Sequence, residues 1–258
     1  MGASLKEFED LDYLVMGCAY SIQNELGRLC DENIYQKDLV TRLVSAGLGD
    51  IYTEVPLRVT YNDFCKTYYL DLVIEGIGLY ELKAVMALTG AHDAQLINYL
   101  HLLGLSYGKL INFGAPKVEG KLIRAGIQGN GPRSFEEDLS GWRSLSPCCR
   151  QLRDVFRELL SDWGSRLSVS LYEEALTYFL GGEDDVVKRL SITRDEVDLG
   201  SQSFRIHTPG IAFQVSAVRK NHQNMEFHLR RLLLHTDLDA IQWLNISNDS
   251  VRYYTVSR

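Results

Sequence analysis

The stretch TYYLDLVIEGIGLYELKAV, residues 67–85, decides the fold. Two short apolar runs, rich in aromatic and β-branched residues, lie on either side of Gly76 and predict two strands joined by a turn. Asp71 lies inside the first run, and Glu81 and Lys83 lie two residues apart in the second. An unpaired charge in an apolar strand is costly or loses its ionisation, so these side chains require partners.

Residues two apart point to the same face of a strand. If the two strands pair, Asp71 and Glu81 converge on one point with Lys83 beside them. Two carboxylates at one point repel each other unless a cation lies between them, and oxygen ligands suit a hard divalent ion. A structural salt bridge from Lys83 to both acids explains the same three residues equally well. The triplet alone therefore leaves a metal site and an ion pair open.

The pattern outside this stretch predicts an α/β domain. Apolar residues spaced by three and four predict helices over residues 4–26, 31–46 and 91–104. Alternating or apolar runs predict further strands over residues 54–61 and 109–114, and one more after a turn at Glu119-Gly120-Lys121. This second Glu-x-Lys has no aspartate at a matching distance upstream, and we interpret it as a solvated turn. The predicted order is helix, three strands, helix, strand.

Two predicted helices carry polar pairs on a single face. Glu32 and Tyr35 are spaced i,i+3, and Gln95 and Tyr99 are spaced i,i+4. With Asp71 and Glu81-x-Lys83, the chain resembles the PD-(D/E)XK nuclease superfamily in its RecB-like form. More narrowly, it resembles the small bacterial proteins named for a GxxExxY motif. The resemblance runs over about residues 10–125 and includes YLDLVIE, YELKAV, AQLINYL and LINFGAPKV; Leu29 stands where the motif has glycine.

The resemblance implies a metal-dependent nuclease, with DNA as the favoured nucleic acid. Mg²⁺ or Mn²⁺ would be held by Asp71, Glu81 and the carbonyl of Leu82, and Glu32 would ligate the metal or position its water. The family pattern gives Lys83 the task of orienting hydroxide and stabilising charge on the phosphoryl group. Gln95 and Tyr99 would fix Lys83 or a backbone phosphate. Tyr35 is a candidate substrate contact, although a tyrosine at this spacing more often packs.

Three internal matches indicate a duplication. YELKAV at 80–85 aligns with FQVSAV at 213–218, and LIN at 110–112 aligns with WLN at 243–245, both 133 residues later. LGRLCDENIYQKDL at 26–39 aligns with WGSRLSVSLYEEAL at 163–176, 137 residues later. We therefore predict two tandem restriction-endonuclease-like domains, residues 1–126 and 150–258, each a small mixed sheet flanked by helices. Residues 127–149 form the predicted linker.

The second copy lacks the charged positions of the first. The candidate residues Glu32, Asp71, Glu81, Lys83, Gln95 and Tyr99 fall on Val169, Phe204, Gln214, Ser216, His228 and Leu232. We interpret this copy as a pseudo-nuclease that positions substrate or a protein partner. Fourteen of the 18 arginines follow residue 130, and the forked guanidinium suits phosphate. Arg230 and Arg231 are the candidate contacts.

Composition narrows the function classes. The chain has 258 residues, with 27 basic and 34 acidic side chains and a net charge of −7, which excludes tight non-specific nucleic-acid binding by global charge. We expect a specialised substrate, a protein partner or a homodimer. Five cysteines without a CxxC predict reduced thiols in the cytoplasm, and no apolar stretch is long enough to span a membrane. The alternative function is a non-catalytic binding or assembly module with a structural ion pair at Asp71, Glu81 and Lys83.

Overall fold

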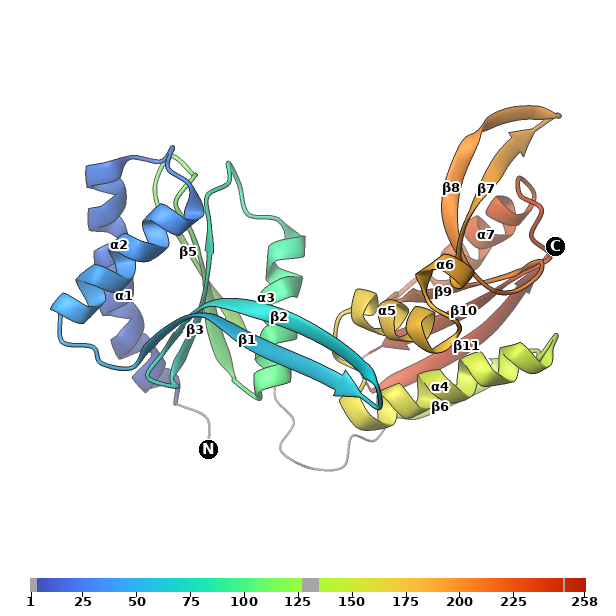
Figure 1. Ribbon diagram of the computed structural model, residues 1–258, viewed down its shortest axis with the longest axis horizontal. Coiled ribbons are helices and arrows are strands. Elements are labelled where there is room, and N and C mark those ends of the chain that lie inside the picture. The colour runs from blue at the N-terminus through green and yellow to red at the C-terminus, as the bar shows by residue number, and fades with distance from the viewer. Residues whose placement is uncertain (1–3, 127–134, 248) are drawn as a thin grey trace. The chain divides into compact units, whose positions relative to one another are not determined.

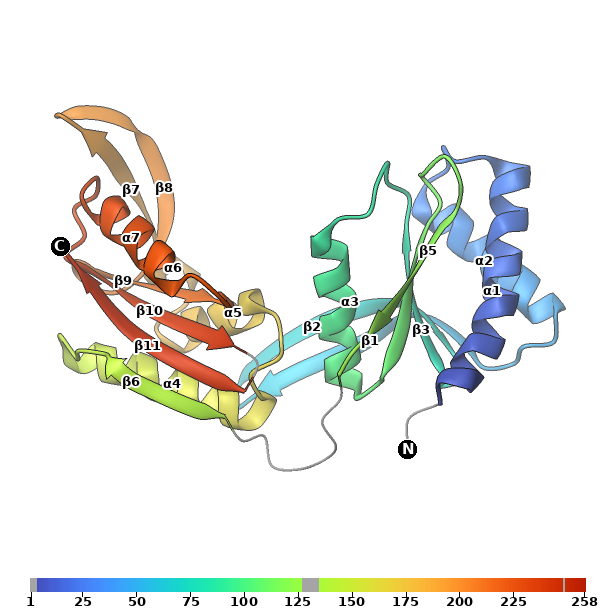
Figure 2. The same cartoon turned by 180° about the vertical axis from the view of Figure 1, so that it is seen from behind.

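The computed structural model describes residues 4–126, 135–247 and 249–258. The chain divides into two compact units, the first formed by Met1–Thr60 and Cys65–Asn130 and the second by Tyr61–Phe64 and Gly131–Arg258. Each unit contains a mixed sheet flanked by helices, as Figures 1 and 2 show from opposite sides. The predicted fold class, two tandem α/β domains with small mixed sheets, is confirmed. Within the described residues, no helix is long and apolar enough to cross a membrane.

The first unit follows the predicted order with one more strand. Its elements are α1 (Leu5–Leu26), α2 (Glu32–Ser45), β1 (Ile51–Tyr61), β2 (Phe64–Ile74), β3 (Gly78–Lys83), α3 (Gly90–Leu103), β4 (Tyr107–Asn112) and β5 (Glu119–Arg124). The strands lie in sequence order across the sheet. β3 pairs antiparallel with β2 and parallel with β4, and β4 pairs antiparallel with β5. The central strand β3 is therefore the one that carries Glu81 and Lys83.

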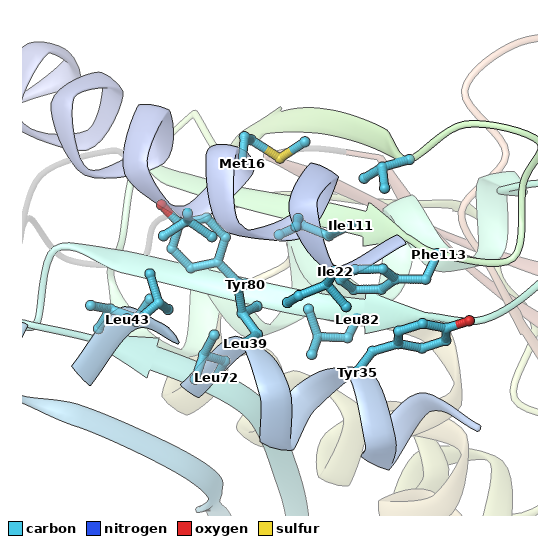
Figure 3. Packing of buried hydrophobic residues seen from close by; sticks show 14 of the residues in the cluster. Met16, Ile22, Tyr35, Leu39, Leu43, Leu72, Tyr80, Leu82, Ile111 and Phe113 are labelled. Carbon is cyan, nitrogen blue, oxygen red and sulfur yellow. The ribbon is translucent and has the colours of Figure 1, made fainter. Parts of the chain in front are cut away.

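Alternation along β3 sends its side chains to two different cores. Tyr80 and Leu82 pack against α1 and α2, where Tyr35 and Phe113 also lie (Figure 3). Leu79 packs against α3 on the opposite face. In Figures 1 and 2, α1 and α2 cover one face of this sheet and α3 covers the other. The period of two along a strand then turns the odd-numbered Glu81 toward α3.

The segment Glu119-Gly120-Lys121 is not a turn. It opens β5, where Gly120 lies opposite Ile111 of β4 and Lys121 forms an ion pair with Asp93 at 2.6 Å. A Cβ at Gly120 would lie 2.7 Å from Cε of Met16. The glycine therefore reflects the close approach of α1 to the strand, which sequence alone cannot distinguish from turn chemistry.

The second unit repeats this order and adds one strand at its start. Its elements are β6 (Glu136–Gly141), α4 (Pro147–Trp163), α5 (Val169–Phe179), α6 (Glu183–Val186), β7 (Val187–Arg194), β8 (Val197–Thr208), β9 (Ile211–Ser216), α7 (His222–Leu233), β10 (Ala240–Ser247) and β11 (Ser250–Ser257). The strand order is β6-β11-β10-β9-β8-β7. With β6 set aside, β7 to β11 follow the same order as β1 to β5.

The predicted linker differs from the structure where it is described. β6 lies inside residues 127–149 and pairs in parallel with β11. Its sequence, EEDLSG, has a single large apolar residue, because this edge strand alternates between exposed and half-buried positions. Such a strand carries no hydrophobic signal. Residues 127–134 of the predicted linker lie outside the described part of the chain.

The strand registers of the two sheets are related by 133 residues. Leu72 lies opposite Tyr80 in the first unit, and Arg205 lies opposite Phe213 in the second. Three further pairs repeat the relationship: Glu81 with Leu110 and Gln214 with Trp243, Lys83 with Asn112 and Ser216 with Asn245, and Leu110 with Lys121 and Trp243 with Tyr254. Each residue of the first sheet thus has a defined counterpart in the second.

A helix–helix bond also repeats, now with the spacing of 137. The Tyr35 hydroxyl donates to the carbonyl of Gly27 at 2.8 Å, and the Tyr172 hydroxyl donates to the carbonyl of Gly164. Both glycines have positive φ angles, +73° and +84°, and end the preceding helix. The two units therefore share the connection between their first two helices as well as their strand register.

Candidate active site

The paired strands β2 and β3 bring Asp71, Glu81 and Lys83 together. Oδ2 of Asp71 accepts a hydrogen bond from the backbone N–H of Leu82 at 2.7 Å. The Nζ of Lys83 lies 3.3 Å from Oε1 of Glu81 and 3.6 Å from Oδ2 of Asp71. The convergence predicted for a hairpin is therefore present, with the ammonium group between the two carboxylates.

Helix α3 supplies the next contacts. The Nε2 of Gln95 donates to Oε1 of Glu81 at 3.0 Å and lies 3.1 Å from the hydroxyl of Tyr99. The i,i+4 spacing places both side chains on the face of α3 that covers the sheet. Both predicted residues lie at the site, but Gln95 contacts Glu81 rather than Lys83 or an open position.

Glu81 is the most deeply buried acid of the site, with 1% of its surface exposed. Its Oε2 has no hydrogen-bond donor among the described residues. Burial, and next the Asp71 carboxylate, raise the pKa of Glu81 to about 8, although Lys83 opposes them. Without a cation, Glu81 therefore holds a proton at neutral pH and shares it with Asp71.

The other charged groups respond to the same cluster. Burial raises the pKa of Asp71 above its usual value, against the opposing effects of Lys83 and the Leu82 N–H. Burial also raises the pKa of Glu32, which lies in the first turn of α2 and interacts with Lys83, Asp71 and the backbone of Ala84. For Lys83, burial alone would lower the pKa, but the carboxylates around it raise it above its usual value. Glu32 thus belongs to the same electrostatic cluster.

Two further side chains at this site were not predicted from the sequence. The Nε2 of Gln36 donates to the main-chain carbonyl of Asp71 at 2.9 Å and to Oε1 of Glu54 at 3.0 Å. Glu54 lies in β1, and its charge raises the pKa of both Glu32 and Asp71. The spacing of Gln36, four residues after Glu32 on one helix face, was the available signal.

Tyr35 lies in the core, not on a substrate surface. Its ring is fully buried and stacks on Phe113 with 4.4 Å between centroids. Its hydroxyl donates to the carbonyl of Gly27 and accepts from the N–H of Cys30 at 3.1 Å. A buried ring whose hydroxyl is already bonded leaves no surface for a substrate, so the candidate contact at Tyr35 is replaced by a structural role.

Arg230 and Arg231 lie in the last turn of α7. Arg230 is held by Glu226 at 2.7 Å and by the carbonyl of Ser257 at 2.9 Å. The guanidinium of Arg231 lies 5.4 Å from the ring centroid of Phe227. The two adjacent arginines therefore have different surroundings, and Arg231 is the less constrained of the two.

The donor set fits a hard divalent cation at Asp71 and Glu81. Both are oxygen donors, and the buried Oε2 of Glu81 is an acceptor that no described group satisfies. No group of three or more aspartate, glutamate, histidine or cysteine side chains in metal-binding arrangement occurs in the described residues. A cation here would therefore combine two carboxylates with a main-chain carbonyl or water, with Glu32 as a more distant acid.

Comparison with known proteins places these residues in a family context. Residues 9–125 match the model of the PD-(D/E)XK nuclease superfamily. The PD-(D/E)XK segment contains every charged residue of the site, from Glu32 to Lys83, and supports a nuclease-type function. A solved structure titled "Crystal structure of SSO0001" is similar, with 20% identity and a TM-score of 0.29 over 48% of this chain and 62% of the other. No curated protein matches the chain.

The second unit lies outside the PD-(D/E)XK match and has a different cluster at the counterpart positions. Gln214, the counterpart of Glu81, lies 3.3 Å from Oε1 of Glu173, which stands at the position of Gln36. Arg205 forms an ion pair with Glu173 at 3.3 Å. An internal guanidinium thus neutralises the one buried acid of this cluster, whereas the first unit has at least two acids around one ammonium.

Proposed function

We propose that this protein is a metal-dependent nuclease that hydrolyses phosphodiester bonds of nucleic acid, with DNA favoured, at the site around Asp71, Glu81 and Lys83. The observation that carries the proposal is the buried Oε2 of Glu81, which has no donor among the described residues and lies in a cluster with Asp71. Burying two adjacent acids without a permanent counter-ion is unfavourable. A site that alternates between a shared proton and a divalent cation removes this cost and serves catalysis.

Asp71, Glu81 and the Leu82 carbonyl would hold Mg²⁺ or Mn²⁺, with Glu32 close enough in charge to orient a water. Such an ion supplies a water of lowered pKa and neutralises charge on the phosphoryl oxygens. Lys83 keeps its proton, because its pKa is raised by the acids around it, and donates a hydrogen bond to the attacking water or to a phosphoryl oxygen. Gln95 holds Glu81 in place, and Tyr99 lies beside it.

The second unit has the place of a degenerate copy in this proposal. Its shared strand order and register support descent from the same fold, and its Glu173–Arg205 pair leaves no acid cluster for a cation. We assign it to positioning substrate or a protein partner, including a second copy of the chain, with Arg231 as the contact to test first. The expected compartment is the cytoplasm, where the five cysteines stay reduced.

The direct experiment is incubation with linear, nicked and single-stranded DNA and with RNA, each with Mg²⁺ or Mn²⁺. Cleavage is expected with the wild type and lost in Lys83→Ala. Lys109→Ala is the matched control, because Lys109 forms a similarly buried ion pair with Asp12 in the same unit, away from this cluster. Absence of cleavage on all four substrates, with both ions, would count against the enzyme.

The alternative function is a binding or assembly module in which Asp71, Glu81 and Lys83 form a structural ion pair. The same buried geometry favours it as far as the Lys83 contacts are concerned. A Mn²⁺ titration monitored by melting temperature separates the two. A ligand that binds the native state raises the melting temperature, so Mn²⁺ should stabilise the wild type and not Asp71→Ala, whereas a structural pair predicts no effect on either.

A further inference from the structure

Gln36 and Glu54 form a pair at the edge of the candidate site that the predicted catalytic set does not include. We propose that Gln36 is a positioning residue, which holds Asp71 and Glu54 on their two strands so that Glu54 adds a further carboxylate to the cation-binding side of the site. This inference rests on the proposed metal-dependent activity. It assigns Gln36 to the order of the ligands and Glu54 to the charge around them.

The geometry of one amide group carries the first step. A glutamine NH₂ has two hydrogens, and Gln36 places them on the carbonyl of Asp71 at 2.9 Å and on the carboxylate of Glu54 at 3.0 Å. α2, β1 and β2 therefore meet at one nitrogen atom. The main chain at Asp71 is fixed directly, and with it the origin of the Asp71 side chain.

The backbone of Glu54 gives the second step. Its φ is +50° although it is neither glycine nor in a hairpin turn, since β1 runs from Ile51 to Tyr61 around it. Such a conformation costs of order 1–3 kcal/mol for an ordinary residue and persists only where neighbouring structure enforces it. The bond from Gln36 is the contact that keeps the exposed Glu54 carboxylate in this place.

Electrostatics show where the Glu54 carboxylate acts. Its charge raises the pKa of Glu32 from one side and of Asp71 from the other. Glu54 therefore lies within the field of the acids proposed to bind the cation, rather than being an isolated surface charge. A further carboxylate at this point increases the attraction for a divalent ion.

The second unit separates fold from site. Residues that brace the fold keep both their type and their bond in the two units, as Tyr35 does in Tyr172 and as Asn112, whose Oδ1 accepts from the N–H of Val85, does in Asn245. Gln36 is instead replaced by Glu173, which makes an ion pair. Gln36 therefore varies with the acid cluster and not with the shared fold.

The test is isothermal titration of Mn²⁺ into the full-length protein. Gln36→Leu should weaken the affinity by about 10-fold or more, the range typical for partners that orient metal ligands. Gln23→Leu is the matched control, because Gln23 also bridges two acceptors through Nε2, the carbonyls of Phe113 at 2.7 Å and Ala115 at 3.0 Å. Gln23→Leu should lower the melting temperature and leave the Mn²⁺ affinity unchanged.

A second variant isolates the charge. Glu54→Gln keeps an acceptor for Gln36 but removes the carboxylate, so it should weaken Mn²⁺ binding several-fold without loss of stability. Glu75→Gln is its control, since Glu75 is likewise exposed with a φ of +51° in the same unit. Wild-type affinity in both Gln36→Leu and Glu54→Gln, or an equal loss in Gln23→Leu, overturns the inference while the proposed function stands. No Mn²⁺ binding to the wild type overturns both.

Discussion

Asp71 and Leu82 are joined by a 2.7 Å hydrogen bond in which the carboxylate of one strand accepts the backbone N–H of the next. Leu82 lies between Glu81 and Lys83, so this bond fixes the Asp71 carboxylate against both functional side chains. Hydrogen bonds to a charged acceptor are among the stronger ones in proteins. The site is therefore ordered by main chain as well as by side-chain ion pairs.

The first prediction concerns the pH dependence of stability without divalent ions. The pKa of Glu81 is raised to about 8 in the folded protein, above its value in the unfolded chain. Between these two values the folded state binds the extra proton, so stability is greatest at low pH and falls as pH rises toward 8. Urea unfolding from pH 5 to pH 8.5 in EDTA should show this fall, and Glu81→Gln should remove much of it.

Mn²⁺ provides the complementary measurement. At pH 8 the cation should replace the proton between Asp71 and Glu81 and restore stability to the wild type. Glu81→Gln should respond weakly, because it has lost one of the two carboxylates. A wild-type stability that is unchanged across this pH range would contradict the burial of a protonated Glu81.

The second prediction separates catalysis from cation binding at Lys83. Lys83→Met should lower the cleavage rate by about 10²–10³-fold, the usual cost of removing one donor to developing charge. Mn²⁺ binding should be retained or become tighter, because the two acids lose their internal counter-ion. Equal losses of cleavage and of Mn²⁺ affinity would instead indicate that Lys83 holds the acids together.

Much of this site was predictable because its signals are local. Asp71, Glu81 and Lys83 lie in one hairpin, where a period of two and one turn decide which side chains meet. Gln95 and Tyr99 are visible as an i,i+4 pair, but their contact with Glu81 depends on how α3 lies across the sheet. The role of Glu54 depends on its φ of +50°, and no residue type or spacing in the sequence announces it.

The same reasoning explains the differences in the fold. Gly120 signals a turn in the sequence, yet it serves the approach of Met16 from α1, a contact about a hundred residues away along the chain. β6 is invisible because an edge strand needs little apolar surface. The internal offset of 133 was recoverable because strand register is tightly specified wherever one face is buried.

The third prediction concerns the hydroxyl groups that join the first two helices of each unit. Tyr35→Phe and Tyr172→Phe should each lower the free energy of unfolding by about 1–2 kcal/mol, because a carbonyl partner loses its donor in a buried place. Cleavage by Tyr35→Phe should remain close to wild type. Tyr13→Phe, at a side chain that is 85% exposed, is the control and should be neutral; a large loss of cleavage in Tyr35→Phe would return Tyr35 to the catalytic set.

The fourth prediction concerns Gly114, which lies against the chain segment that follows Lys83. A Cβ at Gly114 would lie 2.5 Å from the nitrogen of Val85 and 2.6 Å from the carbonyl carbon of Ala84. These are backbone atoms, so Gly114→Ala must displace the segment itself, at a cost of about 1–3 kcal/mol for such overpacking. The displaced backbone includes Ala84, which interacts with Glu32, so cleavage should fall together with stability.

Gly17→Ala is the matched control for this substitution. Gly17 lies within α1, where an added Cβ would have no atom within 4 Å, and alanine in a helix interior is favoured over glycine by roughly 0.5–1 kcal/mol. Gly17→Ala should therefore raise the melting temperature and leave cleavage unchanged. A Gly114→Ala protein that cleaves and melts like the wild type would mean that the backbone after Lys83 can move without disturbing Glu32, and that the site tolerates more motion than its hydrogen bonds imply.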